Sequence, residues 1–340
     1  MTTDVAVLDG EDRTDMSLAL LDLQERADGF AILSRGEGTR RAYRTAWGAY
    51  VDWCRAHNRE PLDANPETVA LYVAARAGDL AVSSIDVAVA AIREAHRLAG
   101  RPLPTDDPRL GMVLQGIRRA KGTRAARKAA PAIPDVLRRL LATRRPTHRP
   151  TGARDRAMML IGFGAALRRS ELVALRVGDV VVEPGRGLIV TITRSKTDQT
   201  GKGREVSVCS NPVDPEFCPV VAFERWMIHR RGGPDGGAPD GPLFCAINRA
   251  DVLSGEPLCD RTVSRLMKDA ARAAGLPEGD YSGHSLRRGF ATAAARAGVG
   301  LADLMRQTRH ASTKVAIGYI EEAGRWQGNA SGAVFTAAKR

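Results

Sequence analysis

Residues 281–319 read YSGHSLRRGFATAAARAGVGLADLMRQTRHASTKVAIGY and carry, in order, His284, Arg287, His310 and Tyr319. His284 and Arg287 are three residues apart, so a helical turn over HSLRR points the imidazole and the guanidinium to the same side. Tyr319 is the ninth residue after His310. These side chains have the chemistry to position a phosphate, neutralise its charge and attack it with a phenol oxygen.

The pattern resembles that of the tyrosine recombinases, or phage integrases: H-x-x-R, then Gly-His or Gly-Trp, then a nucleophilic tyrosine. Two further parts of that pattern lie upstream in the same order. One is Arg168 in LRRSEL, residues 167–172, and the other is Lys196 in RSKT, residues 194–197. The resemblance covers residues 33–335 and is strongest to Cre-type recombinases.

The resemblance implies a mainly α protein with two domains: an N-terminal all-α core-binding bundle, and a mainly α catalytic domain with a small antiparallel β-sheet. It implies a site-specific recombinase that cuts and rejoins double-stranded DNA through a 3′-phosphotyrosyl intermediate, with no metal and no cofactor. It also implies a homo-tetramer on two inverted-repeat sites. The predicted catalytic residues are Arg168, Lys196, His284, Arg287, His310 and Tyr319, with Glu171 supporting Arg168.

The residue types suit metal-free cleavage of a phosphodiester. Arg168 and Arg287 offer planar, paired donors that match phosphate oxygens and stay charged at any relevant pH. By analogy with oxyanion-hole donors, each is worth about 3 kcal/mol of transition-state stabilisation. Tyr319 can form a covalent ester whose phenol leaves more readily than an alkoxide when the strand is resealed. His310 can add a hydrogen bond to the same phosphate.

By the same resemblance, His284 accepts or relays the tyrosine proton, and Lys196 protonates the leaving 5′ oxygen as general acid. Lys202 lies on the same loop and is a second candidate for that acid. Each residue alone has an ordinary explanation, such as a capping arginine, a half-buried tyrosine or a solvated turn lysine. Their joint occurrence, in order and at matching spacings, favours the catalytic interpretation.

Two positions depart from the family pattern. Arg309 precedes His310 where the family usually has glycine, and this predicts an altered local turn. Before Arg168 the chain reads Gly-Ala-Ala-Leu in residues 164–167, in place of the usual Thr-Gly-Leu. Neither change removes a functional group, so activity remains the expectation.

Composition and patterning divide the chain into five parts. Residues 1–32 form an acidic tail predicted to be disordered, and 33–120 an α-helical domain that, by the resemblance, is the core-binding, DNA-binding domain. Residues 121–132 form a basic linker, since six bases occur in the eleven residues from Arg118 to Lys128 and prolines follow. Residues 133–327 form the catalytic domain. By resemblance, residues 328–340 form a C-terminal helix that contacts a neighbouring subunit.

The predicted N-terminal bundle has four helices. Thr39 is predicted to cap the first, and Ser83-Ser84 the third, whose Ile85, Val89, Ile92 and His96 fall on one side. The second starts at Pro66, and the fourth runs from Pro108 to Lys121. A solvated bundle without DNA contacts is the alternative interpretation of its exposed arginines.

The second domain is predicted to hold a buried central helix, one hairpin and further helices. The apolar run 153–166 predicts the central helix. The β-rich runs 188–193 and 205–209 predict the hairpin, and the Gly- and Pro-rich run 232–241 a surface loop. The remaining predicted helices are 135–142, 170–175, 219–229, 261–274, 285–297, 301–308 and 313–320.

The charge of the chain is positive and unevenly distributed. The net charge is +12, whereas residues 1–30 hold eight acidic and two basic residues, so the other 310 residues carry +18. So basic a protein suits a polyanionic partner such as DNA, because each Lys or Arg that contacts a phosphate releases counterions. The candidate DNA contacts are Arg40, Arg44, Ser84, Arg97, Arg118, Arg119, Lys121 and Arg261. Most of them are expected to touch phosphates, which position the protein without reading sequence.

The five cysteines are odd in number, scattered and without a C-x-x-C pair, which argues against a disulfide framework or a zinc site. We interpret all five as small buried apolar residues in a reducing compartment. The sequence lacks a membrane-length apolar run and a secretory signal pattern, so no membrane partner and a cytoplasmic location are expected.

Two other functions fit parts of the pattern. A type IB topoisomerase shares the phosphotyrosine chemistry but relaxes supercoils as a monomer. A DNA-binding regulator with an inactive site would share only the basic surface. Strand exchange between two short DNA sites would distinguish a recombinase from a topoisomerase. A covalent protein–DNA adduct would distinguish a recombinase from a DNA-binding regulator.

Overall fold

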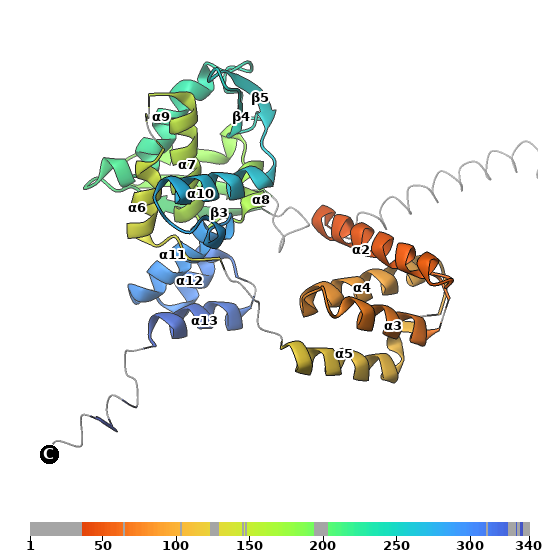
Figure 1. Ribbon diagram of the computed structural model, residues 1–340. Helices are drawn as coiled ribbons and strands as arrows, with labels where there is room; N and C mark the ends of the chain where they lie inside the picture. The colour runs from red at the N-terminus through yellow and green to blue at the C-terminus, as the bar shows by residue number, and fades with distance from the viewer. Residues whose placement is uncertain are drawn as a thin grey trace, which may run out of the picture. The chain divides into compact units, whose positions relative to one another are not determined.

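The protein is described from a computed structural model that covers 36–63, 65–102, 104–122, 129–144, 146, 148–193, 203–310, 312–325, 331, 334 and 335 (Figure 1). The chain divides into two compact units, Met1–Ala126 and Arg127–Arg340. This division falls inside the predicted basic linker. The described elements are mostly α-helices with small antiparallel sheets, which confirms the predicted fold class.

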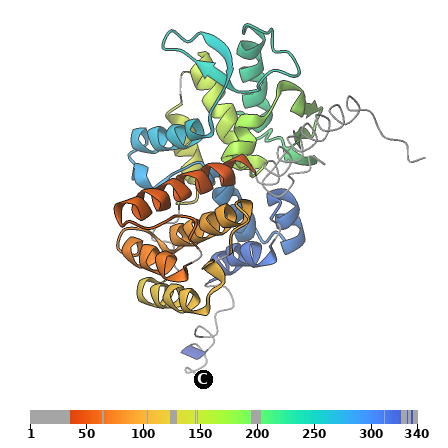
Figure 2. The same cartoon turned by 90° about the vertical axis from the view of Figure 1, so that its right-hand side faces the viewer.

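The described part of the first unit is a bundle of α-helices around one core (Figure 2). Its aromatic centre is formed by Tyr50, Tyr72 and Trp53, whose rings meet edge to face at centroid distances of 5.0 and 5.5 Å. The predicted side of the third helix is buried, including His96. The elements are α2 (Glu37–Ala56), α3 (Pro66–Arg76), α4 (Val82–Leu98), the 3-10 helix η1 (Pro104–Asp106) and α5 (Pro108–Lys121).

Two predicted helix caps in this unit are wrong, because both helices begin earlier in the chain. Thr39 and Ser83-Ser84 lie inside the first turns of α2 and α4, whose N-cap residues are Gly36 and Ala81. The other two helices start where proline predicts, at Pro66 and Pro108. There the preceding Asn65 and Asp107 accept hydrogen bonds from backbone N–H groups of the first turn.

The second unit is built around α7 (Pro150–Gly164), almost wholly buried as its apolar sequence predicts. It contacts α6 (Pro134–Ala142), α8 (Arg169–Ala174), α9 (Pro219–Arg231) and α11 (His284–Arg296). Figure 1 shows α7 in the middle of this unit. The other helices are η2 (Val177–Asp179), η3 (Pro215–Phe217), α10 (Asp260–Ala273), η4 (Glu278–Asp280), α12 (Leu301–Thr308) and α13 (Thr313–Ala323).

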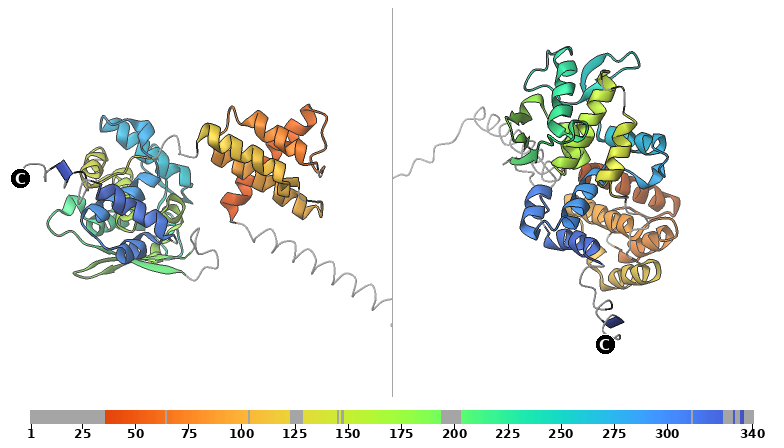
Figure 3. Two further views of the ribbon diagram at one scale, coloured as in Figure 1. Left: turned by 90° about the horizontal axis from the view of Figure 1, so that it is seen from below. Right: turned by 90° about the vertical axis from the view of Figure 1, so that its left-hand side faces the viewer.

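The predicted hairpin is present, and it is part of a three-stranded sheet. Strands β2 (Gly187–Ile192) and β3 (Arg204–Cys209) pair antiparallel, with Val190 opposite Val206. A third strand that was not predicted, β1 (Val180–Glu183), pairs with the other edge of β2. This sheet lies at one side of the unit (Figure 3). A second small antiparallel sheet, β4 (Cys245–Ile247) with β5 (Leu253–Pro257), was also not predicted.

Residues 281–319 fold as three successive helices. α11, α12 and α13 share a small apolar cluster of Ala291, Leu304 and Ala316, against which Tyr319 packs. The predicted bounds of α12 are correct, and those of α11 and α13 differ by at most three residues. This cluster fixes the helix of Tyr319 against the helix of Arg287.

The cysteine interpretation is correct for three residues and wrong for two. All five cysteines are free thiols, and Cys54, Cys218 and Cys245 are buried. Cys209 and Cys259 are exposed, because they lie at the end of β3 and just before α10. Among the described residues, no helix combines the length and apolar character of a membrane span, and no group of three or more His, Cys, Asp or Glu could hold a metal.

A buried glycine lets the chain entering the second unit lie directly on α11. Backbone N–H groups of Ala130 and Ala132 donate to the carbonyls of Asp280 and Ser285 at 2.7 and 2.9 Å. A Cβ at Gly289 would lie 2.2 Å from the Ala132 carbonyl oxygen and 2.4 Å from its carbon. Gly289→Ala should therefore destabilise the protein by about 1–3 kcal/mol, the usual range for overpacking.

Thermal and urea unfolding measure this effect, with Gly318→Ala as the matched control. Gly318 lies within α13, and a Cβ there would meet nothing within 4 Å. The control should be neutral or stabilising by up to about 1 kcal/mol, since alanine favours helix. Equal stability of the two variants would contradict the packing described for Gly289.

Candidate active site

The first arginine of the site begins a helix and is tied to a buried carboxylate. Arg168 is the N-cap residue of α8, and its backbone N–H donates to Glu171 Oε2 at 2.9 Å. Its guanidinium Nη1 donates to Glu171 Oε1 at 2.6 Å. The Glu171 side chain is only 1% exposed, whereas that of Arg168 is 17% exposed. Glu171 therefore holds Arg168 from the protein side, as predicted from the family resemblance.

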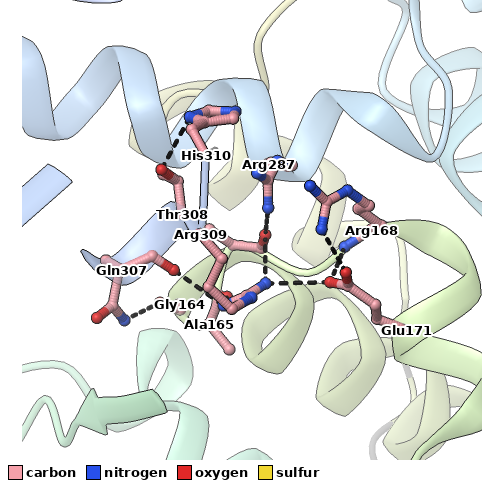
Figure 4. Close-up of polar contacts among 10 residues, drawn as sticks. Gly164, Ala165, Arg168, Glu171, Arg287, Gln307, Thr308, Arg309 and His310 are labelled. Atoms are coloured by element: carbon pink, nitrogen blue, oxygen red, sulfur yellow. Dashed lines mark hydrogen bonds and ion pairs between the residues drawn. The ribbon is translucent and has the colours of Figure 1, made fainter. Parts of the chain in front are cut away.

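The turn between α7 and α8 supplies carbonyl oxygens to the site. Ala166 has a left-handed backbone with φ 47°, a conformation that costs a non-glycine residue about 1–2 kcal/mol. The Leu167 N–H donates to the Gly162 carbonyl at 2.9 Å, which closes the C-terminus of the helix. The Ala166 carbonyl oxygen then faces Arg287 on α11. The Ala165 carbonyl oxygen faces Arg309 in the segment after α12 (Figure 4).

The second arginine is more deeply buried and has an unused donor. Arg287, on α11, is 6% exposed, and its Nη1 donates to the Ala166 carbonyl oxygen at 2.7 Å. Its Nη2 is buried and has no hydrogen-bond partner among the residues that the structure describes. Burial, followed by the charges of Arg168 and Arg309, lowers the Arg287 pKa to about 10, so it remains a cation at neutral pH. A buried cation with a free donor is suited to bind an anion.

A third guanidinium lies in the same network. Arg309, 3% exposed, donates from Nη1 to the carbonyls of Ala165 and Gln307, both at 2.9 Å. Its Nη2 donates to the Ala166 carbonyl at 3.2 Å and to Glu171 Oε2 at 3.1 Å. Figure 4 shows Arg309 beneath Arg287 and beside Glu171. Its backbone is left-handed at φ 55°, ψ 40°, the conformation that glycine favours.

The site has an excess of positive charge, which Glu171 only partly balances. Burial alone would raise the pKa of Glu171. The hydrogen bond from the Arg168 backbone, the Arg309 charge and the Arg168 side chain outweigh burial, so its pKa is lower than usual. Burial lowers the Arg309 pKa, and Glu171 opposes that change. Three guanidinium groups and one carboxylate leave a local net charge of two positive units.

His310 is held in one orientation by the end of α12. Its Nδ1 lies 2.9 Å from Thr308 Oγ1, and the Thr308 hydroxyl is also 2.6 Å from the Leu304 carbonyl oxygen. Because a carbonyl can only accept, the single hydroxyl proton of Thr308 goes to Leu304, and Thr308 accepts from His310 Nδ1–H. Burial and the charges of Arg287, Arg168 and Arg309 lower the His310 pKa to about 4. At pH 7 the ring is therefore neutral, with its lone pair on Nε2.

Tyr319 lies against His310 on the next helix. The two rings are nearly parallel, with centroids 5.9 Å apart and planes at 17°. Tyr319 is half-buried, and burial raises its pKa, partly countered by the charges of Arg288 and Arg287. The phenol is thus protonated at neutral pH and must lose its proton as it attacks. Arg288, which also lies near Glu322 at 3.9 Å, is a neighbour of Tyr319 that sequence reasoning did not single out.

The structure brings together four of the six predicted catalytic residues, as well as Glu171. Arg168 and Arg287 lie in the hydrogen-bond network around the end of α7, His310 lies near enough for both charges to lower its pKa, and Tyr319 packs on His310. His284 is the first residue of α11, one turn before Arg287, and its side chain is exposed whereas that of Arg287 is buried. Lys196 and its alternative Lys202 lie outside the described residues.

The predicted DNA contacts lie on helices, and most are exposed. Arg44 on α2, Ser84 on α4 and Arg261 on α10 are exposed, as is Arg119 on α5, whereas Arg40 is partly buried. Three others already have partners within the protein. Arg97 pairs with Glu94 at 2.8 Å, Arg118 with Asp86 at 2.6 Å, and Lys121 donates to the Ala77 carbonyl.

Sequence reasoning missed the supporting groups of the site. Arg309 was interpreted only as a change of turn, although an arginine in a glycine position was itself a signal. Gln307 donates to the carbonyls of Gly164 and Ser207 at 2.8 and 2.9 Å, linking α12 to α7 and β3. Thr308 fixes the tautomer of His310. No local pattern indicated the roles of Gln307 and Thr308. The first depends on segments 100 or more residues away, and the second on a single hydroxyl proton.

Comparisons with known proteins show the family of this chain. Residues 133–324 match the model of the phage integrase family. An integrase/recombinase XerD homolog of Selenomonas ruminantium is 36% identical over 304 residues, covering 87% of this chain and 85% of that protein. The Cre recombinase of Escherichia phage P1 is 28% identical over 294 residues, covering 81% and 80%.

Solved structures share the fold. A lambda integrase (75–356) dimer bound to a COC′ core site matches with a TM-score of 0.60 and 17% identity, covering 90% of this chain and 96% of that one. The XerH recombinase in its post-cleavage complex with palindromic difH matches with a TM-score of 0.53 and 17% identity, covering 78% and 73%.

The hydroxyl of Thr308 should decide which nitrogen of His310 carries the proton. In the wild-type protein at pH 7, ¹⁵N NMR should show a neutral ring protonated at Nδ1. In Thr308→Val the acceptor is gone, and the Nε2–H tautomer should increase. The buried His96 in the first unit, whose Nδ1 lies 3.0 Å from the Ile92 carbonyl, should be unaffected and is the internal control. A wild-type His310 protonated at Nε2 alone would contradict the arrangement.

Proposed function

Because the chain belongs to the phage integrase family and is a tyrosine recombinase, a site-specific recombination enzyme, we propose that it cleaves DNA through a 3′-phosphotyrosyl intermediate at Tyr319. One observation carries the proposal: the Nη2 of Arg287 is buried beside Arg168, without a hydrogen-bond partner in the described part of the chain, in a site with net positive charge. A phosphate diester is the anion in DNA that this planar pair of guanidinium groups would fit.

The proposed cleavage step exchanges one phosphate ester for another. The Tyr319 oxygen bonds to phosphorus, the bond from phosphorus to the 5′ oxygen breaks, and the 3′ strand end becomes esterified to the protein. The phenol proton passes to His284, and the leaving 5′ oxygen takes a proton from Lys196. Attack by a 5′ hydroxyl from the partner strand reverses these steps. The ester keeps the bond energy, so the reaction needs no nucleotide cofactor or metal.

We assign the guanidinium groups and His310 to the phosphate itself. Arg168 and Arg287 neutralise its non-bridging oxygens, each at about 3 kcal/mol of transition-state stabilisation. His310 is neutral before DNA binds, because burial and three cations surround it. A bound phosphate would favour the imidazolium, since an adjacent anion raises the pKa of a histidine. Its Nε2–H can then donate to the phosphate as charge develops.

The proposed partner is double-stranded DNA bearing inverted-repeat target sites, and the proposed assembly is a homo-tetramer on two such sites. Related recombinases are bound to DNA in solved structures, and the basic body of this chain suits the same partner. We expect α2, α4 and α10 to face the duplex. The proposed contacts remain Arg40, Arg44, Ser84, Arg97, Arg118, Arg119, Lys121 and Arg261. Action on cellular DNA would place the protein in the cytoplasm.

Replacing the phenol should abolish the covalent intermediate without affecting DNA binding. The duplex for this test is the sequence selected by the full-length protein from random DNA, nicked so that a cut strand cannot be resealed. Wild-type protein should form a denaturation-resistant adduct, and Tyr319→Phe should form none, because no oxygen remains to bond phosphorus. Tyr281→Phe, a buried tyrosine in the same unit, is the matched control and should retain the adduct.

The selected sequence tests the recombinase assignment independently of the adduct. An inverted-repeat pair with a short spacer supports a recombinase. A non-specific pool together with relaxation of any supercoiled plasmid would replace the assignment with a type IB topoisomerase. If the wild-type protein binds DNA specifically but forms no covalent adduct, the remaining assignment would be a DNA-binding regulator.

The C-terminal segment should be needed for subunit contact but not for chemistry. Only Ser331, Val334 and Phe335 of it are described, and the last two have apolar side chains that are 68% and 79% exposed. Deleting residues 328–340 should leave cleavage of a single site largely intact and abolish recombination between two sites. Replacing Val334 and Phe335 by Ser should act in the same way, because burial of their apolar surface would drive the contact. Unimpaired recombination by either variant would refute this role.

A further inference from the structure

Arg309 is better placed to hold the catalytic arginines than to touch DNA. Its side chain is 2% exposed and donates hydrogen bonds to three backbone carbonyls and to Glu171. We propose that Arg309 is a positioning residue for the phosphate site, which fixes Arg168 through Glu171 and Arg287 through the Ala166 carbonyl. This inference rests on the proposed function, because positioning matters only if the two arginines bind the reacting phosphate.

Two shared acceptors carry the argument. The Ala166 carbonyl oxygen accepts from Arg287 Nη1 at 2.7 Å and from Arg309 Nη2 at 3.2 Å. The Glu171 carboxylate accepts from Arg168 Nη1 at 2.6 Å and from Arg309 Nη2 at 3.1 Å. Among the side chains that the structure describes, Arg309 is thus the one that donates hydrogen bonds to the acceptors of both catalytic arginines. Without it, each acceptor loses a charged donor, and both can shift.

The backbone supports the same conclusion. Ala166 and Arg309 both have left-handed φ values, 47° and 55°, that glycine would adopt without strain. The guanidinium of Arg309 bonds to the carbonyls of Ala165 and Ala166 and so ties one strained turn to the other. Strained conformations persist where the surrounding contacts over-determine them, and they cluster at functional sites. A purely structural arginine would not need to join these two turns.

The test compares Arg309→Gly and Arg309→Lys with the wild type. Glycine suits the backbone at φ 55° and removes all of the hydrogen bonds. Lysine keeps the charge but lacks the planar fork that reaches several acceptors. Arg230→Met is the matched control, since Arg230 is also fully buried and bonds to Asp235 and to the Pro242 carbonyl, away from the site.

Single-turnover cleavage of the selected, nicked duplex is measured at saturating protein, together with DNA affinity and thermal unfolding. Arg309→Gly should cleave about 10- to 100-fold more slowly, as expected when supporting groups let catalytic residues shift by about 1 Å. Its DNA affinity should be unchanged, and Arg309→Lys should lie between it and the wild type. Arg230→Met should lose stability and keep the wild-type rate per folded molecule.

A second readout needs no DNA. The charged and titratable groups facing His310 are Arg287 on α11, Arg168 at the start of α8, the adjacent Arg309 and Tyr319 on α13. Removing the Arg309 cation should stabilise the imidazolium, so the His310 pKa followed by NMR should rise from about 4 towards its ordinary value in Arg309→Gly. In Arg309→Lys, which keeps the charge, it should stay low.

The outcomes separate this inference from the proposed function. A wild-type protein that forms no adduct would overturn both. An active wild type with Arg309→Gly within threefold of its rate, or slowed only in proportion to its unfolded fraction, would overturn the positioning role alone. If Arg309→Gly does not fold, Arg309→Lys tests the positioning role instead. Cleavage by Arg309→Lys at the wild-type rate would overturn that role, and a reduced cleavage rate per folded molecule would support it.

Discussion

One carboxylate, that of Glu171, binds two guanidinium groups beside the end of α7, and a third, that of Arg287, lies next to them on the Ala166 carbonyl. It accepts from the Arg168 backbone, the Arg168 side chain and Arg309, and its side chain is 1% exposed. Breaking a buried pair of this kind costs about 3–5 kcal/mol, because a charge is left without compensation. The carboxylate does not neutralise the cluster fully. The remaining positive charge, and the Nη2 of Arg287 that has no hydrogen-bond partner among the described residues, suit an anion.

The cluster depends in turn on two strained turns. Left-handed backbone at Ala166 and Arg309 costs about 1–2 kcal/mol at each residue. Because of these left-handed residues, the turn after α7 presents its carbonyl oxygens to Arg287 and Arg309, and the turn after α12 directs the Arg309 side chain into the protein. The same low-dielectric, cationic surroundings keep His310 neutral. Local backbone, burial and proton location are therefore linked in one arrangement.

Local signals predicted much of this molecule, and long-range packing decided the rest. The bounds of α5 were predictable because Pro108 starts the helix and Gly122 follows its last residue, and the order of catalytic residues was readable as a motif. Strands β1, β4 and β5 are three to five residues long and carry too little periodicity to be recognised. The sequence could not predict that the Arg309 side chain points into the protein. Its acceptors at Ala165, Ala166 and Glu171 lie about 140 residues upstream and are brought near only by folding.

The most direct test of the account is a crystal structure of Tyr319→Phe bound to its selected DNA duplex. The guanidinium cluster predicts a backbone phosphate with one oxygen about 3 Å from Arg287 Nη2 and with Arg168 on a second oxygen. The phenyl ring that replaces the Tyr319 phenol should lie beside the phosphorus. A duplex whose phosphates all lie beyond reach of Arg287, with Nη2 bonded instead to the protein, would contradict the account.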